Sequence, residues 1–83
     1  MVIQVDYSPN FTRIIQKIKD AALKEKVKGQ IRKIIENPEA GKPMRFERKG
    51  TRELYVAPFR LSYAYLKEES KIVLLDLYHK DEQ

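Results

Sequence analysis

The chain has 83 residues, no cysteine and a formal net charge of +5. A chain this short has room for one hydrophobic core, so we expect residues 1–83 to form a single domain. Because cysteine is absent, neither a disulfide nor a thiolate-bound metal can stabilise so small a domain, which favours support from a partner chain. The positive charge favours a polyanionic partner, either a nucleic acid or an acidic protein segment.

The sequence shows no targeting or membrane-spanning segment. Met1 to Asp6 contain no basic flank before a long apolar run, and no later segment approaches the ~18 apolar residues of a membrane span. We therefore expect a cytoplasmic protein without membrane association.

The N-terminal segment predicts a strand that leads directly into a helix. Ile3, Val5 and Tyr7 alternate with polar residues, which is the period of a half-buried strand. Ser8 then supplies an N-cap, and Pro9 is suited to the first helical position.

The apolar residues that follow predict two helices. Up to Ala22 they recur at helical spacing, but from Leu23 onward they centre on nearly the opposite side of the same helical wheel. One straight helix could not turn both stripes toward a sheet, so we expect helices at 10–20 and 23–36 joined by a tight bend. The alternative is one kinked helix. The Asn-Pro pair at 37–38 ends the second helix.

The second half of the chain predicts a turn-rich loop at 39–43 and then a sheet. Alternating segments between turn residues predict a short strand at 44–48 and longer strands at 53–57, 59–66 and 72–78. Pro58 cannot donate a hydrogen bond to a ladder, so it should mark a bulge or a bend. The last strand is the most apolar and is expected centrally in the sheet.

The order of the main elements is therefore β-α-α-β-β-β. Two helices and a mainly antiparallel sheet separate into two layers, which places the fold in the α+β class with a helical hairpin on one face of the sheet. The other face is then free to be concave and solvated.

The strand at 59–66 is expected to place one arginine on that second face. Its odd positions are bulky and apolar and should pack on the helices, which leaves Arg60 and Ser62 on the opposite side. A guanidinium would thereby be fixed on a rigid strand. The alternative is an arginine that pairs with a strand neighbour such as Glu53.

A basic segment and a lone histidine are further candidates. The segment at 42–52 contains one acidic residue and five cations: Lys42, Arg45, Arg48, Lys49 and Arg52. Either a phosphate backbone or plain solvent could face these charges. His79 is the only histidine and precedes Lys80 at the end of the last strand. A histidine in such a place is usually an exposed residue without a chemical role.

Other site types find little support in the sequence. A Gly-rich phosphate loop, a Cys/His cluster and a matched carboxylate pair are all missing, so we expect neither a metal nor a nucleotide cofactor. The tyrosines of the strands, Tyr55, Tyr63, Tyr65 and Tyr78, could offer stacking surfaces. Tyrosines on strands are more often core or rim residues.

Three segments resemble the RelE/ParE superfamily of toxin-antitoxin toxins. GTRELYV at 50–56 and FRLSY at 59–63 match the superfamily's Arg-x-Leu-x-Val strand and its aromatic-Arg-aliphatic-x-Tyr strand. LDLYHK at 75–80 is similar to the last strand, which commonly ends in His or Gly followed by Lys or Arg. The resemblance covers nearly the whole chain and implies a RelE-like fold.

The resemblance further implies a ribosome-dependent mRNA endonuclease that inhibits translation and is silenced by a cognate antitoxin, in an assembly such as a heterotetramer. Arg60, Arg52 and Lys49 match the family's cationic positions, and Lys80 matches its last-strand cation. Many relatives carry a tyrosine soon after this strand, but here the chain continues Asp-Glu-Gln, which leaves His79 or, if the strand twists, Tyr78 for proton transfer. The expected sites are catalytic residues Arg60, His79, Lys80 and Arg52, and RNA-binding residues Lys49, Arg48, Arg45 and Lys42.

Two other functions stay open. A ParE-like inhibitor of DNA gyrase is a non-enzymatic protein binder on the same fold, so only the site can separate it from a nuclease. A plain basic RNA-binding module is the third hypothesis. It ranks last because such modules usually show an exposed aromatic platform, which the sequence does not indicate.

Overall fold

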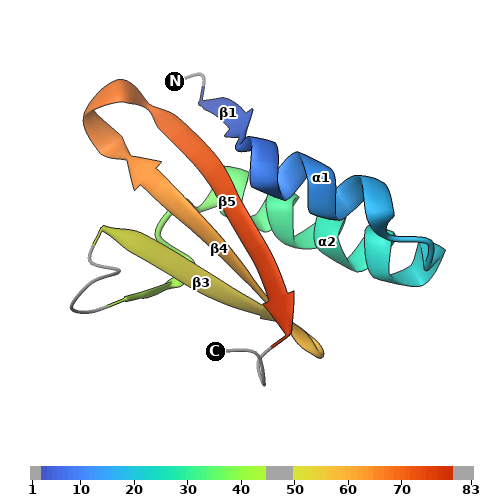
Figure 1. Ribbon diagram of the computed structural model, residues 1–83. Coiled ribbons are helices and arrows are strands. Elements are labelled where there is room, and N and C mark those ends of the chain that lie inside the picture. Colours follow the sequence, from blue (N-terminus) through green and yellow to red (C-terminus); the bar gives the residue numbers. More distant parts are fainter. Residues whose placement is uncertain (1–2, 45–49, 80–83) are drawn as a thin grey trace.

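Within residues 3–44 and 50–79, which the computed structural model describes, two helices pack on one face of a five-stranded sheet (Figure 1). The elements are β1 (Gln4–Tyr7), α1 (Pro9–Lys17), α2 (Ala21–Glu36), β2 (Lys42–Pro43), β3 (Thr51–Val56), β4 (Phe59–Leu66) and β5 (Lys71–His79), with a short 3-10 helix at Lys67–Glu69. This confirms the predicted α+β class and adds the short strand β2 to the predicted order of main elements.

The bend between the helices follows from side-chain capping. Ser8 caps α1, as predicted, because its hydroxyl accepts a hydrogen bond from the backbone N–H of Phe11 at 3.0 Å. Asp20 caps α2 in the same way. Because Ile18 leaves α1 in an extended conformation and Asp20 already caps α2, the first helix ends at Lys17 and not at Asp20 as predicted. Two separate helices are confirmed.

The sheet has the strand order β1-β5-β4-β3-β2. Among the described strands, β1 is parallel to β5, and the other neighbours are antiparallel. The most apolar strand, β5, therefore lies inside the sheet between β1 and β4, but the central position that we predicted for it is taken by β4. The ladder between β4 and β5 shifts register between Ser62 and Tyr63.

The strands near the basic segment begin at other residues than predicted. β2 is Lys42–Pro43, inside the segment that we predicted as a loop, and the backbone N–H of Met44 extends the pairing by donating to Thr51 O at 3.0 Å. The remainder of the predicted strand, residues 45–48, lies outside the described residues. Pro58 lies in the tight turn between β3 and β4, which is the predicted bend.

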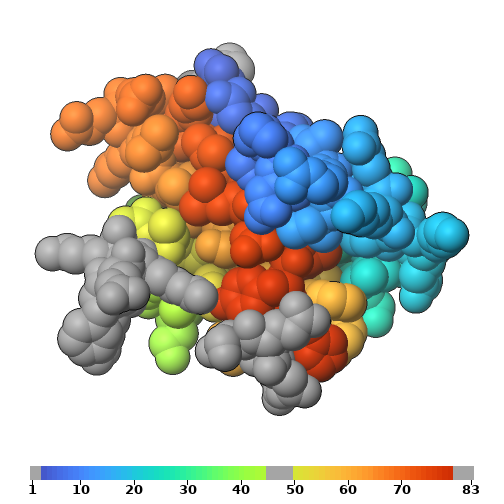
Figure 2. Space-filling model, viewed as in Figure 1, coloured from blue at the N-terminus to red at the C-terminus, as the bar shows by residue number. Residues whose placement is uncertain are grey.

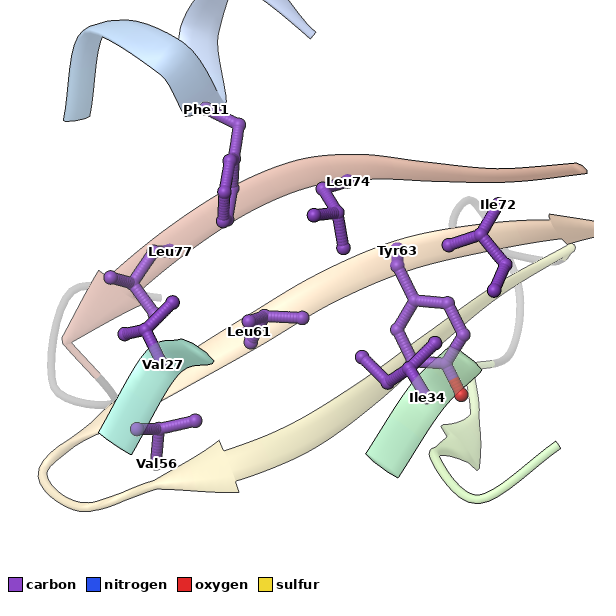
Figure 3. Packing of buried hydrophobic residues seen from close by; sticks show 9 residues of the cluster. All are labelled: Phe11, Val27, Ile34, Val56, Leu61, Tyr63, Ile72, Leu74 and Leu77. Carbon is purple, nitrogen blue, oxygen red and sulfur yellow. The ribbon is translucent and has the colours of Figure 1, made fainter. Parts of the chain in front are cut away.

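The core fills the space between the helices and the sheet (Figure 3). Figure 2 shows α1 lying directly against β5 at the surface. In β4, Leu61 and Tyr63 are fully buried, and Phe59 and Tyr65 pack against the core, so the odd positions face the helices as predicted. The other fully or nearly buried apolar residues are Phe11, Val27, Ile34, Val56, Ile72, Leu74 and Leu77. We call the opposite side of the sheet, which carries no helix among the described residues, the open face.

Tyr63 and Arg52 tie the loop after α2 to the sheet. The Tyr63 hydroxyl donates to Pro38 O at 2.7 Å and accepts from the backbone N–H of Gly41 at 2.8 Å. Burial raises the pKa of the Tyr63 hydroxyl, so it keeps the proton that it donates. The Arg52 guanidinium donates to Glu39 O at 3.1 Å and to Gly41 O at 2.8 Å. These bonds fix the point from which β2 starts.

Substitution of Gly41 tests how closely this loop packs on Tyr63. A Cβ at Gly41 would lie 2.7 Å from the Tyr63 ring, so we expect Gly41→Ala to lower the free energy of unfolding by roughly 1–3 kcal/mol. Gly29→Ala is the matched control, because a Cβ there meets nothing within 4 Å and alanine stabilises a helix by up to about 1 kcal/mol over glycine. Urea unfolding measures both variants. Equal midpoints would contradict the close packing.

Candidate functional site

Three side chains from neighbouring strands meet on the open face. They are Glu53 of β3, Arg60 of β4 and Tyr78 of β5, which we call the open-face cluster. Arg60 lies directly opposite Tyr78, and Glu53 lies opposite Ser62, the next residue of β4 on the same face as Arg60. The strand register therefore brings these three side chains together.

Glu53 holds the open-face cluster in place. Its Oε1 atom lies 3.6 Å from Nη1 of Arg60, and its Oε2 atom accepts a hydrogen bond from the Tyr78 hydroxyl. The Glu53 side chain is only 3% exposed, and a carboxylate buried to this degree needs an ionic or hydrogen-bonding partner. The sequence left open that Arg60 pairs with a strand neighbour such as Glu53. The structure contains this ion pair.

Arg60 keeps part of its guanidinium available to a ligand. Its side chain is 39% exposed, and within the described residues its buried Nε atom has no hydrogen-bond partner. A guanidinium carries five N–H donors in a planar fork that suits phosphate oxygens. Arg60 can therefore contact an anion on the open face while Nη1 stays near Glu53.

Two more side chains extend the site along the sheet. Tyr55 of β3 lies directly opposite Arg60, so Tyr55, Arg60 and Tyr78 form one row across three strands. Lys42 of β2 is exposed and lies opposite Glu53, which places this predicted RNA-binding residue at the edge of the open face.

The structure does not bring Arg52 and His79 together with Arg60. Arg52 lies opposite the buried Tyr63, and its guanidinium binds the loop after α2. His79 lies opposite Phe59, and the two rings meet edge to face with centroids 5.6 Å apart. Because side chains alternate between the faces of a sheet, both residues point toward the helix side. The remaining predicted site residues, Lys80, Lys49, Arg48 and Arg45, lie outside the described residues.

Glu53 was not predicted as a member of the site, because the sequence suggested it only as a strand neighbour of Arg60. The available signal was its place between Arg52 and Leu54, where alternation turns an acidic side chain toward the face opposite Leu54. Tyr78 was considered as a stacking surface or as a substitute for His79, and the structure places it beside Arg60.

The chemistry of the open-face cluster is that of proton transfer next to an anion. A phenol and a carboxylate can exchange a proton with a reacting hydroxyl, and a guanidinium stabilises developing negative charge on an oxygen. In the part of the chain that the structure describes, no group of acidic and histidine side chains could hold a metal ion, and no helix is long and apolar enough to cross a membrane.

Comparison with known proteins decides the family. A family model described as the ParE toxin of the type II toxin-antitoxin system parDE matches residues 5–83. The chain belongs to this ParE toxin family. It is therefore a toxin of a toxin-antitoxin system, and the resemblance to the RelE/ParE superfamily is confirmed. No curated protein matches its sequence.

Solved structures share the fold of this ParE-family toxin. A YoeB/ParE toxin from Agrobacterium tumefaciens is 17% identical with a TM-score of 0.84, and the match covers 93% of this chain and 98% of that one. The RelBE2 toxin-antitoxin complex from Mycobacterium tuberculosis gives 25% identity, a TM-score of 0.81 and coverage of 96% and 100%. The E. coli RelBE toxin-antitoxin complex is 14% identical with a TM-score of 0.78, and the match covers 94% of this chain and 96% of that one. The predicted RelE-like fold is confirmed.

Proposed function

We propose that this ParE-family toxin is a ribosome-dependent mRNA endonuclease that inhibits translation in the cytoplasm. The observation that carries the proposal is the open-face cluster, in which an arginine that is partly free to bind an anion lies beside a phenol bonded to a buried carboxylate. All three side chains stand on rigid strands of the face that carries no helix among the described residues.

In the proposed reaction, the 2′-oxygen of one nucleotide attacks the adjacent phosphorus while the bond from phosphorus to the 5′-oxygen breaks. The 2′-hydroxyl gives its proton to the Tyr78 oxygen as Tyr78 passes its own proton to Glu53. Arg60 stabilises the negative charge on the phosphate oxygens. The leaving 5′-oxygen takes a proton from water, and the hydroxide that remains recovers the proton held on Glu53 through Tyr78, so the products are a 2′,3′-cyclic phosphate and a 5′-hydroxyl. Lys80, the last-strand cation that the resemblance implies, would supply a second positive charge to the phosphate.

The basic segment is proposed to hold the RNA backbone. Lys42 lies at the edge of the open face, and Arg45, Arg48 and Lys49 follow it in the sequence. Phosphate contacts of this kind position a strand without selecting its sequence. Arg52 serves this segment indirectly, because it binds the loop from which β2 starts.

We also propose a cognate antitoxin as the protein partner, in a toxin-antitoxin heterotetramer. Two structures that share the fold are toxin-antitoxin complexes, RelBE from E. coli and RelBE2 from Mycobacterium tuberculosis. The net charge of +5 is complementary to an acidic antitoxin segment.

Primer extension on a reporter mRNA in cell-free translation tests the proposed nuclease. The wild-type protein should create new 5′ ends on translated message and none on the same RNA without ribosomes. Arg60→Lys keeps a positive charge near Glu53 but loses the guanidinium fork, so we expect about 10²- to 10³-fold less cleavage. Arg32→Ala is the control, because Arg32 is an exposed cation on α2. Intact message at high concentrations of the wild-type protein would contradict the proposal.

Inhibition of DNA gyrase is the second candidate function. The family model that matches is that of ParE toxins, and a groove of about 480 Å³ lies along α1 and α2, lined by apolar residues that include Phe11, Ile15 and Val27. A gyrase inhibitor would block DNA supercoiling, and Arg60→Lys would leave that inhibition unchanged. A supercoiling assay with both proteins separates the two functions.

A further inference from the structure

We propose that the exposed ring of Tyr55 is the stacking platform for one base of the bound RNA, beside the phosphate that Arg60 contacts. This inference rests on the proposed nuclease function and adds a nucleobase subsite to it. The subsite would take any base of a single-stranded RNA, because every base presents a π-face.

The strand register places Tyr55 where a neighbouring base would lie. Tyr55 and Arg60 are directly opposite each other on β3 and β4, and side chains in that relation share a face, with Cβ atoms roughly 4.5–5.5 Å apart. Tyr78 lies on the other side of Arg60 in the same row. A nucleotide whose phosphate contacts Arg60 therefore has an aromatic ring within reach of an adjacent base.

Tyr55 differs from the other tyrosines of the sheet in its exposure. It is 55% exposed, whereas Tyr63 is fully buried and Tyr65 packs against the core. Tyr78 is committed to Glu53 through its hydroxyl. The structure records no hydrogen bond or ion pair between the Tyr55 side chain and the residues that it describes. An aromatic ring that is held by a strand and left open to solvent is available for stacking.

The charges around Tyr55 favour RNA over an apolar protein segment as the occupant. Arg60 is its direct neighbour, and the exposed Lys42 lies on the same face, opposite Glu53. Glu53, the acidic residue of the cluster, is buried and paired with Arg60, so its charge is compensated. Exposed aromatic rings among cations are the combination by which proteins bind single strands without sequence preference. Tyr55 is thus the aromatic platform that the sequence did not indicate.

Binding of a 2′-O-methylated single-stranded octanucleotide at low salt, followed by fluorescence anisotropy, tests the subsite without cleavage. We expect Tyr55→Leu to weaken binding about 5- to 150-fold and Tyr55→Phe to preserve it, because one stacked base contributes roughly 1–3 kcal/mol. Tyr7→Leu is the matched control. Tyr7 is 53% exposed, but it pairs with the buried Leu74 and lies on the helix side.

An octanucleotide with abasic sites shows whether a base is what Tyr55 contacts. On this probe, Tyr55→Leu and the wild type should bind equally. The inference is overturned if Tyr55→Leu binds the normal probe as the wild type does, if its loss is as large on the abasic probe, or if the wild type binds neither. The translation assay judges the nuclease separately, because uncut translated message contradicts the proposed function whatever the octanucleotide does.

Discussion

Tyr78→Phe should lower the rate of mRNA cleavage by about 10²- to 10⁴-fold, the usual contribution of a group that transfers a proton in the transition state. Phenylalanine keeps the ring and removes only the hydroxyl that donates to Glu53. Binding of RNA through Arg60 and Tyr55 should therefore change little. Single-turnover cleavage of ribosome-bound mRNA measures the rate, and anisotropy with the uncleavable octanucleotide measures the binding.

His79→Phe is the control for this experiment. It keeps the aromatic contact with Phe59 and removes both ring nitrogens, so cleavage should stay within about tenfold of the wild-type rate because His79 points to the helix side. A large loss in His79→Phe together with a small loss in Tyr78→Phe would contradict the role given to Tyr78. It would support His79, the residue that the sequence favoured.

Arg60→Leu should lower the free energy of unfolding by roughly 2–3 kcal/mol, because it removes the ion pair between Arg60 and the buried carboxylate of Glu53. Fully buried pairs lose about 3–5 kcal/mol in this way, and the 39% exposure of the Arg60 side chain reduces the effect. Urea unfolding measures the loss. For this reason Arg60→Lys, and not a neutral variant, is the better test of activity.

A second substitution separates the charge effect from lost packing. Glu53→Gln removes the buried charge and keeps an oxygen that accepts from Tyr78, so the double variant Arg60→Leu/Glu53→Gln should be more stable than Arg60→Leu alone. If the two substitutions destabilise additively, the ion pair is not what holds the cluster.

The elements of the fold could be predicted because their signals are local. Ser8 and Pro9 mark the start of α1. The alternation at 59–66 predicts on which face of the sheet each side chain of β4 lies. The predicted end of α1 was wrong because Ile18 already takes an extended conformation as the C-cap of α1, and Asp20 is the N-cap of α2. β2 was missed because a strand of two residues has no period of its own and exists only through its hydrogen bonds to β3.

The site could be predicted only in part. Alternation placed Arg60 correctly on the open face, and the same rule groups Arg52 with Leu54 and His79 with Leu77, on the helix side. The family pattern grouped Arg52 and His79 with Arg60 instead. The contact between Glu53, Arg60 and Tyr78 depends on how three strands align. That alignment includes the register shift after Ser62, which no local pattern contains.

The parallel pairing of β1 with β5 joins Gln4 to Lys71, so the first strand acquires its neighbour only after the rest of the sheet has been synthesised. Contacts so distant in the chain form slowly, because loop closure must precede them. Tyr78 lies on β5, which is synthesised last, whereas Glu53 and Arg60 lie on β3 and β4, which are synthesised earlier. A nascent chain that still lacks β5 therefore cannot complete the open-face cluster, which forms only when the last strand joins the sheet.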